Sequence, residues 1–582
     1  MKNAKKTGAL LLALVMLFAL LSACTSTPAA PTPAPSEAPQ TTAAPAPASN
    51  SDSGQTASTP EPTPEPEPVW DGTQIPLADD KITFRVWATY FDYFAGKLTD
   101  YNELYSTQLM EEQTNVHIEW LLPAASDIQT GFSLMLSSDD LPDMICGFKN
   151  YYNKSDTQAV ADGLILELTD YADEFLPNYL KRVADAGVDL EIRDDEGRMN
   201  EIYTLSLTRM GRTKSHTSGL ETRQDWADNL GLAIPETYDE FESYLLALKA
   251  AYDLSAPLNM GHTIANSGDV HLIGGYGIND KFYKVNGTDT IGYGPTTPNY
   301  RDALRRLHSW YQQGIIDQDF ISRTGSDRVL ISDNKSAMWV WAFTMLGQKG
   351  YNSGRLADPN SFVISVQNPV LNKGEKNHFG PMDVSYLDSP NAITSNCKDI
   401  ETLLKWCDYL YTEPGALTRN FGKEGESYRF DGEEIVVSND WFDKWFDMED
   451  SIGVYSAGVF LPLQFVPGVM YDTLSWTLDG PFSNAYGYSE EDEALKVNWH
   501  NNDNAYCIPT TLSLTADESS AISNVMADCD TLAAEQYVRF ITGVDNIDDD
   551  AVWESYVAQM ESIGIARALA AEQAAYDRYI HR

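Results

Sequence analysis

Hydrophobic and polar positions alternate over residues 82–87, a period of two that predicts a β-strand. A helical pattern over 101–113 follows, and then a second strand around 116–120. Residues 128–136 again show helical spacing, and they precede a short apolar run at 143–146. Strand, helix, strand, helix, strand in this order predicts the α/β class, with a mainly parallel sheet flanked by helices.

In such sheets, ligands bind beyond the carboxyl ends of the strands. Trp87, Tyr90 and Phe91 stand at the end of the first predicted strand, and Phe148 follows the third. These aromatic residues are therefore expected at a cleft.

The second half of the chain shows mainly helical spacing. Thr237 and Glu240 form a capping box that predicts a helix start, and glycines at 231 and 314 are expected to end helices. Further helices are predicted over 400–411 and 551–582, with buried strands at 336–341 and 362–366.

The N-terminal 24 residues combine a basic start, an apolar run and a cysteine. Three lysines precede the run 9–21, as in an export signal, and the run is short for a spanning helix. Leu21-Ser22-Ala23-Cys24 resembles the lipobox of bacterial lipoproteins, which implies a signal peptide over 1–23 and a lipid on Cys24. The alternative is an ordinary secretory signal with an incidental cysteine.

Residues 24–69 are rich in Pro, Thr, Ala and Glu and contain almost nothing that could fill a core. They are expected to form a solvated linker, partly polyproline, with a reach of roughly 140 Å if extended and about 40 Å as a flexible coil. The remaining residues, 70–582, are enough for two domains with their own cores.

The formal net charge is −45, which disfavours nucleic acid and polyanions and favours neutral or cationic ligands. General solubility explains this acidity equally well. Five cysteines remain beside Cys24, of which Cys407 fits a helix core and Cys507 with Cys529 is a possible disulfide.

Several segments, in this order and spacing, resemble the extracellular solute-binding proteins (family 1) of bacterial ABC sugar importers, in particular their large lipoprotein subgroup. They are 111–119, 136–143, 223–226, 314–317, 422–428 and 576–579. The resemblance implies a two-lobed periplasmic-binding-protein-like fold of type II, whose lobes close around a ligand by a hinge.

The expected N-lobe spans about 78–205 plus a returning segment at about 345–395, and the expected C-lobe spans about 206–344 and 396–582. By the same resemblance, the protein is a monomer on the extracellular face of the cytoplasmic membrane that delivers an oligosaccharide to permease subunits, and it is no enzyme.

Many members of this subgroup carry a calcium loop after the helix that corresponds to 237–251. Residues 252–259 lack the alternating oxygen ligands and turn glycine of such a loop, so no cofactor or metal is expected there.

Sugar recognition needs aromatic faces for the C–H side of a pyranose and directed polar groups for its hydroxyls. The candidate ligand residues are Trp87, Tyr90, Phe91, Phe148, Arg223, Trp226, Trp341, Tyr428 and Trp476. For each aromatic residue the alternative is core packing, and for Arg223 it is a salt bridge to Asp225.

Two other function classes stay open. A surface glycosidase or lyase needs only a carboxylate pair, and the chain has 85 acidic residues, although no nucleophile, phosphate-loop or zinc motif is present. A receptor for peptides or another small solute without a transport role is the other alternative.

Overall fold

The computed structural model describes most of the chain from Val69 onward. The described residues are 69–90, 99–123, 127–138, 140–152, 154–194, 196–207, 218–261, 269–323, 326–342, 345–352, 354–380, 387–438, 466–471, 476–479, 494–509 and 512–581. The signal peptide, Cys24, most of the linker and Phe91 lie outside these residues.

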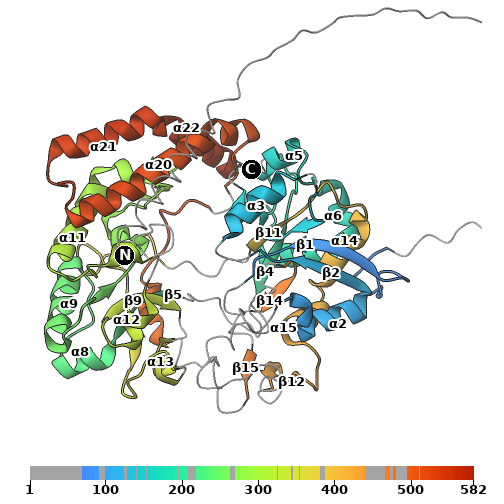
Figure 1. Cartoon of the computed structure of the whole chain (residues 1–582), viewed down its shortest axis with the longest axis horizontal. Coiled ribbons are helices and arrows are strands. Elements are labelled where there is room, and N and C mark those ends of the chain that lie inside the picture. The colour runs from blue at the N-terminus through green and yellow to red at the C-terminus, as the bar shows by residue number, and fades with distance from the viewer. Residues whose placement is uncertain are drawn as a thin grey trace, which may run out of the picture. The chain divides into compact units, whose positions relative to one another are not determined.

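A sheet with strand order β14-β4-β11-β3-β1-β2 forms the centre of one lobe, called the N-lobe (Figure 1). Its strands are β1 (Ile82–Trp87), β2 (Val116–Leu121), β3 (Met144–Ile145), β4 (Ile202–Leu207), β11 (Leu387–Ile393) and β14 (Val469–Tyr471). Within this sheet β11 runs antiparallel to β3 and β4, whereas the other pairings are parallel. The mainly parallel sheet expected from the sequence is therefore confirmed here.

Helices cover both faces of the N-lobe sheet. One face packs against η2 (Tyr101–Glu103), α2 (Tyr105–Thr114), α6 (Thr169–Phe175), α7 (Pro177–Ala186), α14 (Ile400–Tyr409) and α15 (Glu413–Phe421). The other face packs against α3 (Ile128–Leu136), α4 (Phe148–Tyr151) and α5 (Asp156–Ala161). A smaller sheet of β12 (Tyr428–Asp431), β13 (Glu434–Val437) and β15 (Trp476–Leu478) contributes side chains to the first core.

The second lobe, the C-lobe, contains a sheet with order β10-β5-β9-β6. Its strands are β5 (Ser218–Arg223), β6 (Leu258–Asn259), β9 (Met338–Ala342) and β10 (Val363–Ser365), with a separate hairpin of β7 (Phe282–Lys284) and β8 (Ile291–Tyr293). Strand β5 is antiparallel to both neighbours, so this sheet differs from the mainly parallel pattern expected.

The helices of the C-lobe pack in two cores, one of which contains Leu220 and Met338 of its sheet and the other Trp339 and Val363. The elements are α8 (Gln224–Leu230), α9 (Tyr238–Tyr252), α10 (Asp269–Ile273), η4 (Gly274–Tyr276), η5 (Val285–Gly287), η6 (Gly294–Thr296), α11 (Pro298–Gln312), η7 (Phe320–Ser322), α12 (Arg328–Ser332), α13 (Lys349–Asn352), η11 (Val497–His500), α20 (Ala516–Thr542), α21 (Asp550–Ile563) and α22 (Ile565–Ile580).

Neither lobe is a continuous stretch of chain, and the observed division differs from the expected one. Residues of 397–476 pack in the N-lobe core, whereas the sequence analysis assigned this region to the C-lobe. Conversely, residues of 345–366 pack in the C-lobe, because β10 pairs with β5 in register from Val363 to Ser365. The chain thus passes between the lobes after β4, after β10 and after β15.

Local rules predicted many helix ends correctly. Thr237 and Glu240 form the expected capping box, and Gly231 ends α8 in a left-handed conformation. The C-terminal helix is interrupted, however, because Gly564 has φ +116° and separates α21 from α22. Cys507 and Cys529 are both free thiols, so the possible disulfide is absent.

A buried carboxylate, Asp408 on α14, joins distant parts of the N-lobe. It accepts hydrogen bonds from the backbone N–H groups of Asn178 and Tyr179, both at 2.9 Å, and so caps α7, whose own N-cap side chain makes no bond. It also accepts from the Asn178 amide at 2.7 Å and from the Trp70 indole at 2.8 Å. Burial raises the pKa of Asp408, while these donors act to lower it.

We expect Asp408→Ala to lower the free energy of unfolding by about 3 kcal/mol, because it leaves several buried donors unpaired. Urea unfolding would measure this loss. Asp173→Ala, an exposed acid on α6, is the matched control and should change stability by less than about 0.5 kcal/mol. Equal effects of the two substitutions would contradict the role of Asp408.

Candidate functional site

The carboxyl ends of β1 and β3 lie side by side at one edge of the N-lobe sheet. Trp87 pairs with Ile145 in parallel register, so the chain leaves both strands at the same edge. Beyond it, the hydroxyl groups of Thr89 and Tyr151 are 2.7 Å apart, which links the segment after β1 to helix α4 after β3. The expected convergence of these two strand ends is confirmed.

Tyr90 is half-buried at this edge. Its ring stacks on that of Tyr101, with centroids 6.3 Å apart and planes 22° apart. The Tyr101 hydroxyl donates to the Thr89 carbonyl at 2.5 Å, which fixes the backbone that carries Tyr90. Tyr90 therefore presents part of an aromatic surface on a well-supported backbone.

Trp87 and Phe148 lie behind this edge rather than on it. Trp87 is 3% exposed, and its ring contacts those of Phe132 at 5.6 Å and Tyr151 at 5.2 Å. Phe148 is fully buried and stacks on Tyr152 at 4.9 Å. Both belong to the core beneath α3, α4 and α5, and a direct ligand contact for either remains a prediction.

In the C-lobe, Trp341 is the sequence-predicted residue whose side chain is partly exposed. It is half-buried near the end of β9, opposite Gly219 of β5. A side chain at Gly219 would meet the Trp499 indole at 2.5 Å, and this indole donates to the Leu220 carbonyl at 2.7 Å. Trp499 thus fills the space over Gly219 and is itself buried.

Sequence reasoning missed a buried acid in the same sheet. Glu221 of β5 accepts a hydrogen bond from the Trp339 indole at 2.8 Å, and both residues are fully buried. Burial raises the pKa of Glu221 far above its usual range, although the Trp339 donor and the charge of Arg355 act to lower it. An acid inside a buried strand was the available sequence signal.

Arg223 forms the salt bridge to Asp225 that the sequence analysis gave as the alternative to ligand binding. Its guanidinium is 1% exposed and binds Asp225 at 2.6 Å and Asp358 at 2.8 Å, with Asn334 as a further acceptor at 2.6 Å. It also lies 4.3 Å from the ring centre of Trp226.

Trp226 is itself almost fully buried, and its ring stacks on Tyr252 at 4.4 Å. In this conformation, Arg223 and Trp226 fix the junction of β5, α8 and the segment before β10. Ligand contacts for both remain predictions.

Tyr428 and Trp476 lie elsewhere in the N-lobe. Trp476 is buried in the core, and Tyr428 lines an open cavity of about 440 Å³. The other lining residues are Gln113, Glu413, Pro414, Leu417, Thr418, Gly422, Lys423, Glu424 and Phe430. The structure therefore brings neither residue to the strand ends that hold Tyr90.

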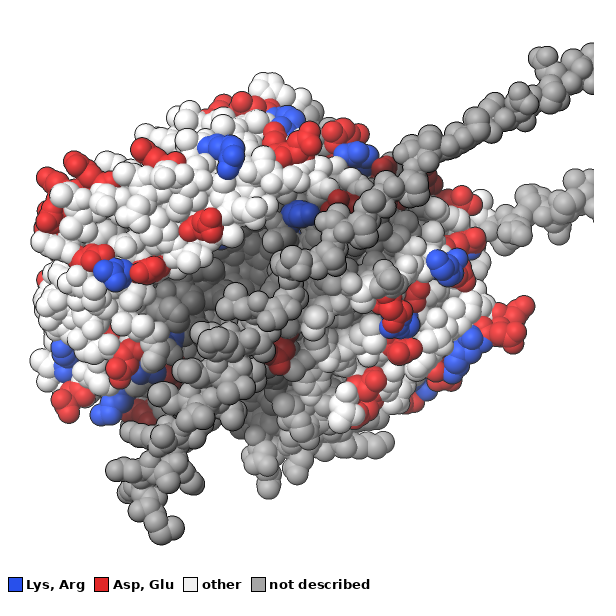
Figure 2. Space-filling view, turned by 45° about the horizontal axis from the view of Figure 1, so that its top comes forward, with Lys and Arg blue, Asp and Glu red and all other residues white. Residues whose placement is uncertain are grey.

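Acidic side chains are scattered over the face shown in Figure 2, and several basic ones lie beside them. Arg305, for example, bridges Asp302 at 2.7 Å and Asp548 at 2.8 Å. Within the described ranges, no set of three or more His, Cys, Asp or Glu residues is placed to hold a metal ion. No helix in those ranges is long and apolar enough to cross a membrane.

Two curated relatives are similar in sequence, although no family model matches the chain. The fructooligosaccharide ABC transporter substrate-binding protein FusA of Streptococcus pneumoniae serotype 4 is 22% identical over 506 residues, covering 82% of this chain and 88% of FusA. The lipoprotein LipO of Bacillus subtilis is 23% identical over 343 residues, covering 56% of this chain and 64% of LipO.

A solved structure shows the same fold. An extracellular solute-binding protein from Bifidobacterium longum subsp. infantis superimposes with a TM-score of 0.66 at 19% identity, covering 86% of this chain and 99% of that protein. FusA in complex with kestose gives a TM-score of 0.63 with similar coverage. The chain has the fold of solute-binding proteins, and the resemblance expected from the sequence is confirmed.

The burial of Trp87 predicts that Trp87→Ala lowers the free energy of unfolding by about 3 kcal/mol or more. This large loss corresponds to the core-packing alternative that the sequence analysis gave for Trp87. Chemical denaturation without ligand would measure the loss, with Tyr171→Ala on α6 as a half-buried aromatic control of smaller effect. Unchanged stability of Trp87→Ala would show that this ring is not needed for the core.

Proposed function

We propose that this protein is the substrate-binding component of a bacterial ABC importer, which captures an extracellular oligosaccharide and delivers it to a membrane permease. The observation that carries the proposal is the fold shared with FusA over almost the whole length of that relative, together with the sequence similarity. The partly exposed aromatic residues Tyr90 and Trp341, one in each lobe, add support.

The proposed mechanism is hinge closure of the two lobes around the sugar. The chain passes between the lobes after β4, β10 and β15, and hinge closure rotates lobes of this kind while each core stays intact. A ligand shifts the equilibrium only through contacts that are tighter in the closed form. We assign Tyr90 and Trp341 to contacts of this kind, with Thr89 and Tyr151 positioning the N-lobe side.

We further propose that the protein is a monomer held on the extracellular face of the membrane by a lipid on Cys24. The sequence around Cys24 supports this, as does the similarity to the lipoprotein LipO. Two acyl chains on one residue give lasting attachment, whereas a single chain gives weak and reversible binding.

The function predicts that an intact oligosaccharide stabilises the protein. A soluble form beginning at residue 68, which keeps the buried Trp70, would be screened by thermal shift against neutral and acidic oligosaccharides and peptides. A ligand at 100 times its dissociation constant should add about 2.7 kcal/mol. Mass analysis of the ligand afterwards distinguishes a receptor from a glycosidase or lyase, since a shortened sugar would identify an enzyme.

Tyr90→Ala and Trp341→Ala should each weaken binding of that sugar by about tenfold, or about 1.4 kcal/mol, because each removes an aromatic face. Titration calorimetry would measure the affinities. Tyr171→Ala again serves as the control and should bind normally. Normal affinity in both site variants would remove these residues from the site, and a response to peptides alone would exclude the carbohydrate assignment.

Cys24→Ala should release the protein from the membrane into the medium, because the lipid has no other attachment point in the proposed scheme. Fractionation of expressing bacteria followed by immunoblotting would measure this. Retention of the variant in the membrane fraction would contradict the lipid anchor, and unchanged monomer mass in light scattering would test the oligomeric state separately.

A further inference from the structure

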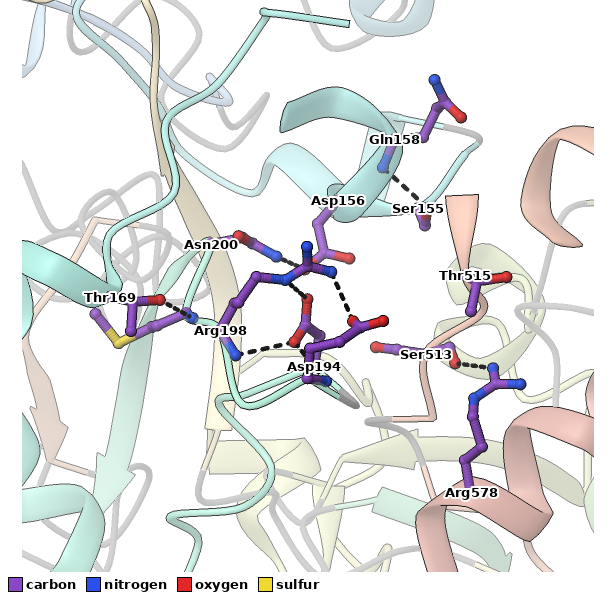
Figure 3. Close-up of polar contacts among 12 residues, drawn as sticks. Ser155, Asp156, Gln158, Thr169, Asp194, Arg198, Asn200, Ser513, Thr515 and Arg578 are labelled. Atoms are coloured by element: carbon purple, nitrogen blue, oxygen red, sulfur yellow. Dashed lines mark hydrogen bonds and ion pairs between the residues drawn. The ribbon is translucent and has the colours of Figure 1, made fainter. Parts of the chain in front are cut away.

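Two buried carboxylates, at the start of α5 and directly before β4 in the N-lobe, take no part in the proposed sugar site. Asp156 is the first residue of α5 and is 9% exposed, and Glu201 directly precedes β4 and is 2% exposed. They come from segments 45 residues apart, and Asn200 connects them: its amide donates to Asp156 Oδ2 at 3.1 Å (Figure 3).

Each carboxylate has one bonded oxygen and one unpaired oxygen. Glu201 Oε2 accepts from the Tyr203 hydroxyl at 3.3 Å. Asp156 Oδ1 and Glu201 Oε1 are buried and have no hydrogen-bond partner among the described residues. A buried acceptor without a donor is costly, and two such charged acceptors close together are more so.

The surrounding charges do not neutralise the pair. Burial, and then the negative charge of Asp156, raises the pKa of Glu201 to about 8, while Lys149 on α4 and the Tyr203 hydroxyl act in the opposite direction. The backbone N–H of Tyr203 donates to the Tyr179 hydroxyl of α7 at 3.2 Å.

Arg198, two residues before Asn200, pairs with other acids. Arg198 donates to Asp194 at 2.8 Å, as Figure 3 shows, and to Glu196 at 2.6 Å. Its charge is therefore shared between two other acids, Asp194 and Glu196.

We propose that Asp156 and Glu201 form a proton-binding site, in which the pair takes one proton from solvent at neutral pH and holds it on Glu201. The proton bonds to the otherwise unpaired Oε1 of Glu201. It removes the negative charge of Glu201 and, with it, the repulsion from Asp156.

This site stands beside a contact between the two lobes. The backbone N–H of Ser155, adjacent to Asp156, donates to Ser519 Oγ of α20 at 2.8 Å, and Ser520 Oγ donates to Gln158 Oε1 at 3.1 Å. Glu201 leads into β4, after which the chain crosses to the C-lobe. Loss of the proton therefore places two like charges next to the contact and weakens it.

The test is the pH dependence of unfolding of the mature, unlipidated chain, compared with Glu201→Gln, which resembles the protonated acid in shape. Because the pKa of Glu201 is raised from 4.5 to about 8 on folding, the folded state binds one more proton between these pH values. The stability from this proton is complete below pH 4.5 and is lost as the pH rises to about 8.

The unfolding equilibrium constant of the wild type should therefore rise up to tenfold per pH unit faster than that of Glu201→Gln in this window. Glu174→Gln, an exposed acid on α6, is the matched control and should follow the wild type. Parallel curves for wild type and Glu201→Gln would overturn the proposal.

If Glu201→Gln does not fold, Asp156→Asn gives a second measurement. Removing the neighbouring charge should lower the pH at which the unfolding equilibrium constant stops rising steeply, compared with the wild type. An unchanged pH for this end point would overturn the shared site. Replacing Na⁺ and K⁺ by tetramethylammonium at constant ionic strength should change nothing; a specific loss of stability would show a metal cation in place of the proton. None of these measurements needs a sugar, so they stand or fall independently of the proposed function.

Discussion

The carboxylate of Asp408 holds together parts of the N-lobe that are far apart in sequence. It lies on α14, which follows the chain's return from the C-lobe, and it caps α7, which precedes the first crossing. It also accepts from Trp70, at the start of the described chain. A lobe made from separate stretches needs such cross-links, because loop closure over these separations costs entropy that only long-range contacts can offset.

Other buried charges fulfil comparable roles. Arg223 joins β5, α8 and the segment before β10 through Asp225 and Asp358, and Arg419 donates to the carbonyl groups of Val466 and Val469 next to β14. Each charge is paired or hydrogen-bonded, as burial requires. These groups hold the backbone around the strand ends in place. The half-buried rings of Tyr90 and Trp341 then provide partly exposed aromatic surfaces.

Local sequence rules were sufficient for most individual elements, but not for the division into lobes. The capping box at Thr237 and the alternation at 82–87 depend on neighbouring residues alone, and both are present in the structure. Strand β11 was not predicted, since Asp388, Pro390 and Asn391 are poor strand formers; the proline is accommodated where the register with β4 shifts. The returning segment expected at about 345–395 contains β11, but it begins too early and ends too early, because residues of 345–366 pack in the C-lobe and residues of 397–476 in the N-lobe.

The sequence predicted the position of the candidate site better than it predicted the residues that form the site. Parallel pairing of β1 and β3 follows from their order, so the edge was found, but the face on which Trp87 lies depends on packing against Phe132 of α3. Strand alternation alone does not tell which face is covered. Glu221 and Glu201 were missed because most acidic residues in so acidic a chain are exposed.

The insertion of Trp70 into the N-lobe core also determines how force would pass through the molecule. On the proposed anchoring, any pull from the membrane enters at Trp70, whose indole is bonded to Asp408 within the N-lobe. The tether thus attaches to the N-lobe alone, through the same buried carboxylate that caps α7. A pull along the tether is therefore applied within one lobe and not across the opening between the two lobes.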